Sequence, residues 1–471
     1  MTPTTAESVI ETGATPVKIA RSGASKVASH SIAILAVQVM ALGSGITNNF
    51  LIARLGGPEG KGILYSLQLI SSVLGLSFLH FCLGWAAVLF LRQKNGTRQQ
   101  IASNVFLPSL LLGMIPAVGL ALLWPWIHNP AAGRLPSVDL WLALLAIPAM
   151  VLTYNVSLFC LGEDKLKHYN ALMAAPSLLL CVSLLALVFV NHTGIEVLIA
   201  AWCGSVYIPA FCAGFVILRA AKGKLLPHVP LFRKMYEFGW RAHLCGALQQ
   251  LQNRSPVLLV AVMLPVAELG IYSLSISLVE LLWYIPQSLS VALLPHVASS
   301  SKEEASRVTP AVCRVTLAIT AVLGFMVAGG CTVLIPWVLP RFTSGLLPLW
   351  ILMPGVAFAS ISRVMASDLN GRNDPMKTFY PVLVALVMET GLGIYCVPKY
   401  GLLGAAAVTA LGYVLNTLLQ IPIYCRIAEV PAKSVLVIQR QDITGILRAV
   451  RVRLDRLRAM VLPEFGESPL G

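Results

Sequence analysis

Residues 238–299 read FGWRAHLCGALQQLQNRSPVLLVAVMLPVAELGIYSLSISLVELLWYIPQSLSVALLPHVAS and contain two long apolar segments around a short turn at Pro265–Leu269. Each segment is long enough to cross a bilayer, which takes about 20 helical residues. The second segment carries Glu280, and the first carries a polar group in its middle: Gln249, Gln250, Gln252, Asn253 and Arg254. A charge at that depth costs about 2.5–3.5 kcal/mol. These side chains are therefore expected to face a protein interior or a water-filled cavity.

The composition is that of a membrane protein. The chain has 471 residues, of which 57% are hydrophobic and 11% charged, and its mean hydropathy is +0.79. Soluble domains average about 25% charged residues. The net charge of +14 does not indicate nucleic-acid binding, because the basic residues lie between apolar segments and form no single patch. The ten cysteines form no CxxC pair and no metal-ligand spacing, so no metal site is predicted.

The hydropathy pattern predicts an all-α polytopic protein of about twelve membrane-spanning helices. The predicted spans are residues 30–54, 62–91, 101–125, 139–161, 169–190, 196–219, 238–264, 268–297, 308–338, 345–370, 377–397 and 402–427. Pro286 is a candidate break in the eighth span.

The loops predict the orientation. Lys and Arg within or at the edges of the loops after spans 2, 4, 6, 8 and 10 number 14, against 5 for the other loops. Because basic loops stay in the cytoplasm, both termini are expected there, in a multi-pass protein of the cytoplasmic membrane.

A weak internal repeat divides the chain in two. Gly62-Ile63-Leu64-Tyr65-Ser66-Leu67 matches Gly270-Ile271-Tyr272-Ser273-Leu274 with one gap, and each copy opens the second helix of its half. Transporters are often built from two repeats with a central binding site. The sequence thus predicts two six-helix lobes around a central cavity. The expected segments are a flexible N-terminus (1–28), a first lobe (29–220), a basic linker (221–237), a second lobe (238–429) and a cytoplasmic tail (430–471).

Several stretches recur in a characteristic order and spacing. They are Phe50–Gly62 (FLIARLGGPEGKG), Asn253-Arg254, Glu268–Leu274, Pro286–Leu289, Leu294-Pro295 and Leu346–Gly371, which includes Leu369-Asn370-Gly371. Together they resemble the bacterial polysaccharide-type transporters, the lipid-linked oligosaccharide flippases of the multidrug/oligosaccharidyl-lipid/polysaccharide exporter superfamily. The resemblance covers about residues 29–429. It implies a cationic cavity between the lobes through which a lipid pyrophosphate passes.

Arg254 and Glu280 are the main candidate site residues. Counted from the outer ends of their spans they lie at similar depths, about 15 and 18 Å in. One reading is a buried ion pair that holds two helices together. The other is that Arg254 binds a phosphate in the cavity through its bidentate guanidinium, with Gln250 and Asn253 beside it.

Further polar residues extend this candidate site. Asn48, Asn49 and Gln68 are expected either to line the same cavity or to bond neighbouring helices. Arg363, Asp368 and Glu389 form a second ionisable set in spans 10 and 11, interpreted either as helix pairing or, for Glu389, as a proton- or sodium-linked carboxylate.

No cofactor or catalytic motif is predicted. The sequence Gly57-Pro58-Glu59-Gly60-Lys61-Gly62 is not a nucleotide-binding loop, because Leu55 replaces a required glycine and Gly62 a required Ser or Thr. A tight turn between helices is predicted there instead. No Ser/His/Asp group or carboxylate pair indicates an enzyme.

The tail is predicted to lie on the membrane surface. One face is apolar and the other faces are crowded with arginines, so the tail is expected to bind anionic lipids. The alternative interpretation is a solvated helix with no role at the membrane. The apolar face consists of Ile443, Leu447, Val450, Leu454 and Leu457.

The sequence favours a flippase that moves a lipid-linked, negatively charged saccharide for surface polysaccharide synthesis, with the polysaccharide polymerase machinery as a further candidate partner. Two alternatives stay open. One is a cation-coupled multidrug-and-toxin exporter, which would take cationic substrates and in which carboxylates would be the main charged groups of the cavity. The other is a non-transporting membrane partner of a polysaccharide assembly complex.

Overall fold

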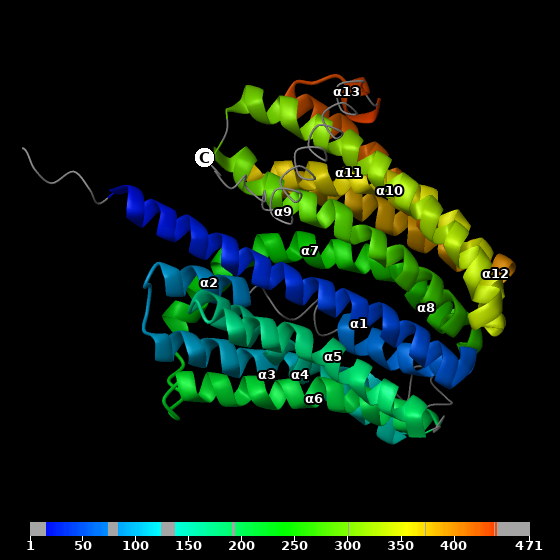
Figure 1. The fold of residues 1–471 in the computed structure, drawn as a ribbon, viewed down its shortest axis with the longest axis horizontal. Coiled ribbons are helices and arrows are strands. Elements are labelled where there is room, and N and C mark those ends of the chain that lie inside the picture. The colour runs from blue at the N-terminus through cyan, green and yellow to red at the C-terminus, as the bar shows by residue number, and fades with distance from the viewer. Residues whose placement is uncertain are drawn as a thin grey trace, which may run out of the picture.

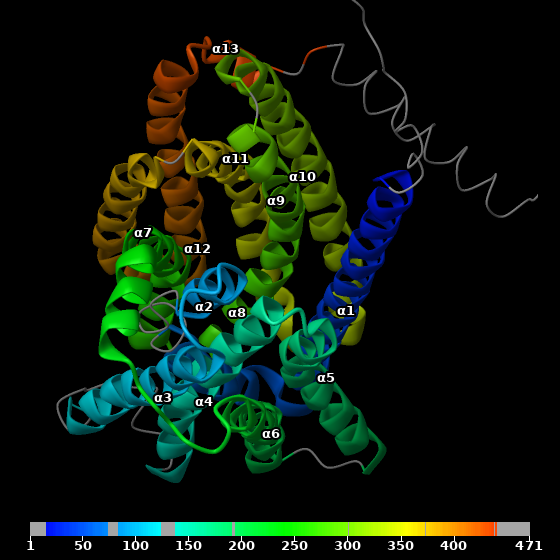
Figure 2. The ribbon, with the colours of Figure 1, turned by 90° about the vertical axis from the view of Figure 1, so that its left-hand side faces the viewer.

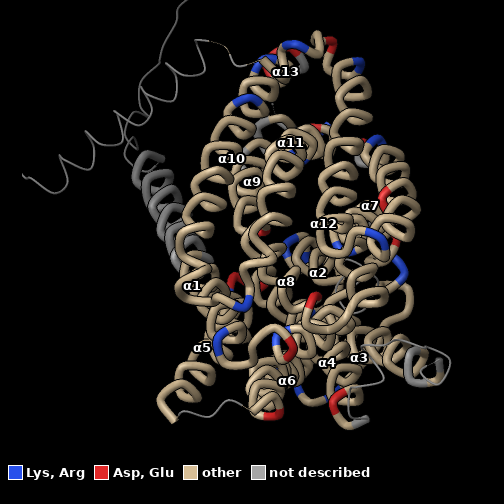
Figure 3. Tube along the Cα trace, turned by 90° about the vertical axis from the view of Figure 1, so that its right-hand side faces the viewer, with Lys and Arg blue, Asp and Glu red and all other residues tan. Residues whose placement is uncertain are grey.

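The computed structural model describes residues 16–73, 83–123, 137–190, 194–299, 301–372, 374–437 and 439. These residues form helices and short connections without a strand, which confirms the all-α fold. Long helices with few charges run through the whole molecule, and Figure 3 shows that most of their length carries neither acidic nor basic residues.

The α-helices are α1 (Pro16–Ser72), α2 (Leu83–Arg92), α3 (Arg98–Leu123), α4 (Ser137–Gly162), α5 (Leu166–Val190), α6 (Ile195–Ala220), α7 (Val229–Met263), α8 (Val266–Glu280), α9 (Tyr284–Ser299), α10 (Lys302–Val338), α11 (Leu346–Gly371), α12 (Phe379–Ala428) and α13 (Lys433–Leu436). Short 3₁₀ helices cover Leu281–Trp283 (η4), Pro340–Gly345 (η5) and Pro375–Thr378 (η6).

Two glycines fold the longest helices back on themselves. Gly57 in α1 and Gly401 in α12 have φ values of 61° and 58°, a region that glycine enters without steric cost. Each of these helices therefore contains two spans, as the sequence predicts. Figure 1 shows α1 reversing at the right-hand end of the molecule.

Eight stretches of the described residues are long and apolar enough to cross a membrane, and the last, Met376–Ala428, contains the Gly401 reversal. α7 is not among them, because glutamines, an asparagine and an arginine interrupt its apolar sequence. The chain is a polytopic membrane protein, and its most polar long helix, α7, combines exposed residues such as Trp240 with fully buried ones such as Gln252.

The helices form two groups, which we call the N-terminal lobe (α1–α6) and the C-terminal lobe (α7–α12). Figures 1 and 2 show α3 to α6 on one side of the molecule and α9 to α12 on the other, with α1, α7 and α8 between them. Apolar side chains of α1, among them Ala53 and Leu69, and Val73 just after it join the core of the C-terminal lobe. α1 and α8 therefore hold the lobes together.

The two copies of the internal repeat meet at this junction. A Cβ on Gly62 would lie 1.9 Å from the carbonyl oxygen of Val266, and a Cβ on Gly270 would lie 1.9 Å from that of Pro58. In each case the carbonyl belongs to the residue four positions before the other glycine. The contact has an approximate twofold symmetry and requires glycine on both sides.

The eighth span breaks slightly before the expected position. α8 ends at Glu280, η4 follows, and α9 starts at Tyr284, so that Pro286 lies in the first turn of α9. Since proline has no N–H, the carbonyl of Leu282 lacks its usual helical donor, which favours the 3₁₀ turn just before it. The break leaves Glu280 at a helix end.

Three segment boundaries differ from those expected. α1 begins at Pro16, inside the segment predicted to be flexible, and α7 begins at Val229, inside the predicted linker. His228 caps α7 by accepting a hydrogen bond from the Leu231 N–H, and Pro230 suits a first helical turn. Residues 430–437, assigned to the tail, pack on the C-terminal lobe, where Val435 is fully buried.

The shortened linker is fixed to α3. Asn104 both accepts from the His228 N–H (3.0 Å) and donates to the His228 carbonyl (3.1 Å). Ser103 Oγ accepts from the Leu226 N–H, and Gln99 donates to the Lys224 carbonyl, each at 2.9 Å. Residues 221–228 therefore belong structurally to the N-terminal lobe.

An ion-pair group closes the same end of that lobe. Burial alone would raise the pKa of the Glu163 carboxyl, but hydrogen bonds from Arg98 and Lys165 outweigh it, and the pKa lies below its ordinary value. The group ties the start of α3 to the connection between α4 and α5.

Candidate functional site: a cavity between the lobes

A central cavity of about 310 Å³ lies where α1, α4, α6, α7 and α8 meet. Both lobes contribute to its wall. The lining residues are Asn49, Tyr65, Gln68, Leu69, Ser72, Met150, Trp202, Arg254, Ser277 and Glu280. Four of the seven predicted cavity residues are in this list: Asn49, Gln68, Arg254 and Glu280.

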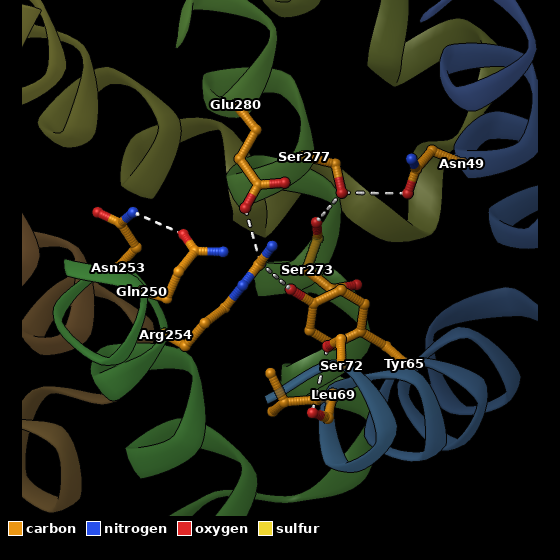
Figure 4. Close-up of polar contacts among 10 residues, drawn as sticks. All are labelled: Asn49, Tyr65, Leu69, Ser72, Gln250, Asn253, Arg254, Ser273, Ser277 and Glu280. Carbon is orange, nitrogen blue, oxygen red and sulfur yellow. Dashed lines mark hydrogen bonds and ion pairs between the residues drawn. The ribbon is translucent and has the colours of Figure 1, made fainter. Parts of the chain in front are cut away.

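Arg254 and Glu280 form an ion pair across α7 and α8, with 2.7 Å between Nη1 and Oε1. The same Nη1 also donates to the Tyr65 hydroxyl at 3.3 Å, which links the pair to the N-terminal lobe. Figure 4 shows the Arg254 guanidinium between Glu280 and Tyr65. The side chains of the pair are 25% and 38% exposed, so a solute in the cavity can reach both.

Gln250 and Asn253 lie beside Arg254 on α7 (Figure 4) but do not line the central cavity. Asn253 Nδ2 donates to Gln250 Oε1 at 3.3 Å. Gln252, which lies between them in sequence, is fully buried and faces α12, where its Nε2 is 3.4 Å from the Gly412 carbonyl.

The neighbours Asn48 and Asn49 have different surroundings, because consecutive residues lie about 100° apart around a helix. Asn48 is buried against α5 and donates to the Ser177 carbonyl at 2.9 Å. Asn49 faces α8, where its Oδ1 lies 3.1 Å from Ser277 Oγ (Figure 4). Asn48 therefore packs the N-terminal lobe, and Asn49 belongs to the cavity.

Tyr65 and Ser277 are cavity residues that the sequence analysis did not select. Tyr65 precedes Gln68 by one helical turn, and the shared face of that helix is the signal that could have identified it. Ser277 carries no such signal, since a serine in an apolar span usually bonds its own helix. Here Ser277 Oγ also lies 2.7 Å from the Ser273 carbonyl.

A lateral groove of about 140 Å³ adjoins the central cavity between α1 and the α8–α9 region. Asn49, Ser277 and Glu280 line both. Its other walls are mainly apolar and include Ile46, Phe50, Leu281 and Tyr284. Tyr284 is 52% exposed, so the groove is open at this end.

The second ionisable set is not brought together. The Arg363 guanidinium stacks on the Trp283 ring, 4.0 Å from its centroid. Asp368 is fully buried and bonds Thr309 and Arg372.

Glu389, the third member of that set, is buried against Gly412, where an added Cβ would lie 2.5 Å from its Oε2. Neither of its carboxylate oxygens receives a hydrogen bond of normal geometry from the described residues, and the nearest amide is that of Gln252.

The fold is that of known transporters. The lipid II flippase MurJ in an inward closed conformation is 12% identical, with a TM-score of 0.70 over 93% of this chain and 94% of that one. An inward-facing multidrug resistance MATE transporter of the MOP superfamily is 13% identical, with a TM-score of 0.67 over 84% and 98%. A MOP superfamily transporter from Pyrococcus furiosus, described as having a binding pocket of reverse polarity, is 14% identical, with a TM-score of 0.54 over 84% and 94%.

Among curated proteins none matches this chain. The sequence model of one family, described as polysaccharide biosynthesis protein, matches residues 51–343. This match covers more than half of the chain and includes all of α7 with Arg254, all of α8 with Glu280, and both copies of the repeat. The chain is therefore a member of the polysaccharide biosynthesis protein family, with the helical fold of the MATE transporters and MurJ.

Proposed function

We propose that this protein moves a lipid-linked, negatively charged saccharide across the cytoplasmic membrane by alternating access, for the synthesis of a surface polysaccharide. The substrate class is a polyprenyl pyrophosphate that carries an oligosaccharide. The protein acts as a transporter and catalyses no covalent step.

The observation that carries this proposal is the junction of the central cavity with the lateral groove. The cavity offers donors suited to phosphate and sugar hydroxyls, namely Arg254, Tyr65, Gln68 and Asn49. The groove adds mainly apolar walls directly beside these donors. An amphiphile with an anionic head and a long apolar tail fits both at once, because its tail stays in the membrane while its head occupies the cavity.

Arg254 receives the phosphate in this scheme. Its Nη1 makes both contacts, to Glu280 and to Tyr65. Among the described residues nothing bonds Nε or Nη2, so these two nitrogens can donate to phosphate oxygens. A phosphate bound to Arg254 would contact residues of both lobes. Because the two lobes meet this phosphate differently in each arrangement, its binding can favour one arrangement over the other.

The multidrug-exporter alternative rests on the exposure of Glu280, which at 38% exceeds that of Arg254. A cationic drug would bind this carboxylate, and its affinity would rise when Arg254 is removed. The affinity of an anionic substrate would fall with the same change. The two functions thus predict opposite effects of the same substitution.

The buried carboxylate of Glu389 is proposed to couple transport to a cation, a proton or sodium. A carboxylate without a hydrogen bond of normal geometry is costly in a helix bundle unless it is protonated or binds a cation. Glu389→Gln keeps the shape and removes both possibilities. We expect it to leave abundance unchanged and to abolish the dependence of transport on one imposed ion gradient. A variant whose transport still follows both gradients would contradict this role.

The test of the main proposal is a substitution series at Arg254, read as surface polysaccharide in a host that lacks its own flippase and normalised to transporter abundance. Arg254→Lys keeps the charge but loses the bidentate fork, and is expected to retain partial export. Arg254→Ala is expected to abolish export while the protein stays in the membrane.

The double variant Arg254→Gln with Glu280→Gln separates binding from packing. If the pair only holds two helices together, Arg254→Ala strands Glu280 and lowers abundance, and the double variant restores both folding and transport. Full transport by the double variant would reject Arg254 as a substrate ligand.

A further inference from the structure

Lys61 is a buried lysine for which the described residues offer no carboxylate partner. Its residue is 2% exposed, although lysine is among the residues least often buried. Its Nζ donates to Asn49 Oδ1 at 2.9 Å and lies 3.5 Å from the Asn49 carbonyl. Among the described residues no Asp or Glu forms an ion pair with it. The reversal at Gly57 creates this position, since it returns Lys61 to the level of Asn49.

Asn49 separates Lys61 from the central cavity. An ammonium can only donate, so Lys61 requires the oxygen of the Asn49 amide and fixes its orientation. Asn49 Nδ2 donates one of its two hydrogens to the Gly45 carbonyl at 3.0 Å, and the second hydrogen is available to a ligand. Asn49 lines both the cavity and the lateral groove, so the charge of Lys61 lies one hydrogen bond behind their shared wall.

The position on the helix also points to the cavity. Lys61, Tyr65, Gln68 and Ser72 recur at spacings of four, three and four residues, and so share one face of α1. The last three line the cavity. Lys61 lies one turn closer to the Gly57 reversal than Tyr65 and continues the same polar face.

The charge balance of the cavity leaves a role for this cation. Arg254 is paired with Glu280 and adds no net charge, whereas a lipid pyrophosphate carries more than one negative charge. A buried charge is costly without a counter-ion, and the field of a cation is strong in surroundings of low dielectric constant. An anion beside Asn49 would stabilise Lys61, and Lys61 would stabilise the anion.

We propose that Lys61, acting through Asn49 and beside Ser277, makes a second anion subsite at the wall shared by the cavity and the groove. This subsite takes the phosphate that Arg254 does not hold, and so selects a diphosphate over a monophosphate. Lys61 is a positioning residue for Asn49 as well as the source of charge. The inference rests on the proposed transport of a lipid pyrophosphate.

The experiment measures binding to the purified full-length protein in uncharged detergent, with farnesyl diphosphate, farnesyl monophosphate and inorganic pyrophosphate as probes. Lys61→Met is expected to weaken the binding of farnesyl diphosphate by about tenfold or more, because the phosphate loses the field of a cation one hydrogen bond behind the wall. The monophosphate should change much less. Lys61→Arg should keep most of the affinity. Lys399→Met is the matched control, because it removes an exposed cation that lies over the rings of Tyr395 and Tyr400, away from the cavity lining.

Thermal unfolding without ligand distinguishes binding from packing. The subsite predicts that Lys61→Met keeps the wild-type Tm, since the variant loses a buried charge together with its hydrogen bond. A lowered Tm in both Lys61 variants, with unchanged affinity for the diphosphate, would overturn the proposal and make Lys61 structural. Equal weakening of both farnesyl probes would reject the selection of a diphosphate.

The controls separate this inference from the proposed function. If the wild type binds farnesyl diphosphate and Lys61→Met binds it equally well, only the subsite fails. If the wild type binds neither farnesyl probe, the proposed substrate class fails with it. If inorganic pyrophosphate binds as tightly as farnesyl diphosphate and loses affinity in Lys61→Met, this result supports the subsite and shows that it recognises the phosphates alone.

Discussion

Gly62 has the backbone of α8 directly against its Cα, and no side chain fits between the two helices. The obstacle is a carbonyl oxygen of the main chain, which cannot rotate away as the end of a side chain can. Adding a methyl group here forces the lobes apart, at a cost of about 1–3 kcal/mol for an overpacked contact. The substitution therefore destabilises the arrangement of the lobes in which α1 and α8 are in contact.

Gly62→Ala is therefore expected to lower the Tm of the purified protein and to reduce export at equal abundance. Gly204→Ala in α6 is the matched control, because nothing lies within 4 Å of a Cβ at that position. The control should be neutral or slightly stabilising, since alanine favours a helix. Equal Tm values for the two variants would show that the close contact is dispensable.

At the scale of the element, the segment after α12 has a structural role distinct from that of the predicted surface helix. Ser434 offers its carbonyl to the buried Arg314 of α10, and Ser306 donates to the Ala428 carbonyl at 2.8 Å. Val435 fills the core between α10, α11 and α12. The amphipathic residues 443–457 lie outside the described residues, and their binding to anionic lipid stays a prediction.

Two truncations separate these roles. A chain that ends after Glu429 loses the burial of Val435, worth about 1.5–3 kcal/mol, and one acceptor of Arg314. We expect low abundance of this protein in the membrane. A chain that ends after Gln439 keeps both contacts and should export nearly as well as the full chain. Similar abundance of the two would mean that α13 does not stabilise the lobe.

The sequence predicted elements better than contacts. Hydropathy located the spans because each helix must present apolar residues to lipid or to its neighbours. The similar depths of Arg254 and Glu280 predicted their meeting, since helix rise is constant. From the sequence, Lys61 falls in a predicted turn, and Asn48 fits either the cavity or a bond between helices. The correct choice requires knowing how α1 folds back and which face it turns to α5.

The whole molecule has a topology that follows from its charges. The loops that join α2 to α3 and α6 to α7 are predicted to be cytoplasmic, and η5 to lie outside. Reporter fusions at Lys94, Lys224 and Lys302 should report the cytoplasm, and a fusion at Arg341 the exterior. An exterior signal at Lys224 would overturn the orientation and the two-lobe scheme with it, because this connection carries the largest excess of basic residues.

The junction of α1 with α8 also bears on the origin of the chain. Two copies of one sequence motif touch, and each offers the other a glycine and a carbonyl four residues before it. That reciprocity defines an isologous interface, the kind that two identical subunits form across a twofold axis. A half-length ancestor could dimerise through the same atoms. Once two such halves are fused, their sequences can diverge. The residue of the second copy that aligns with Lys61 is Leu269, which is fully buried. A symmetric dimer would bring two lysines together here, whereas the fused chain keeps one.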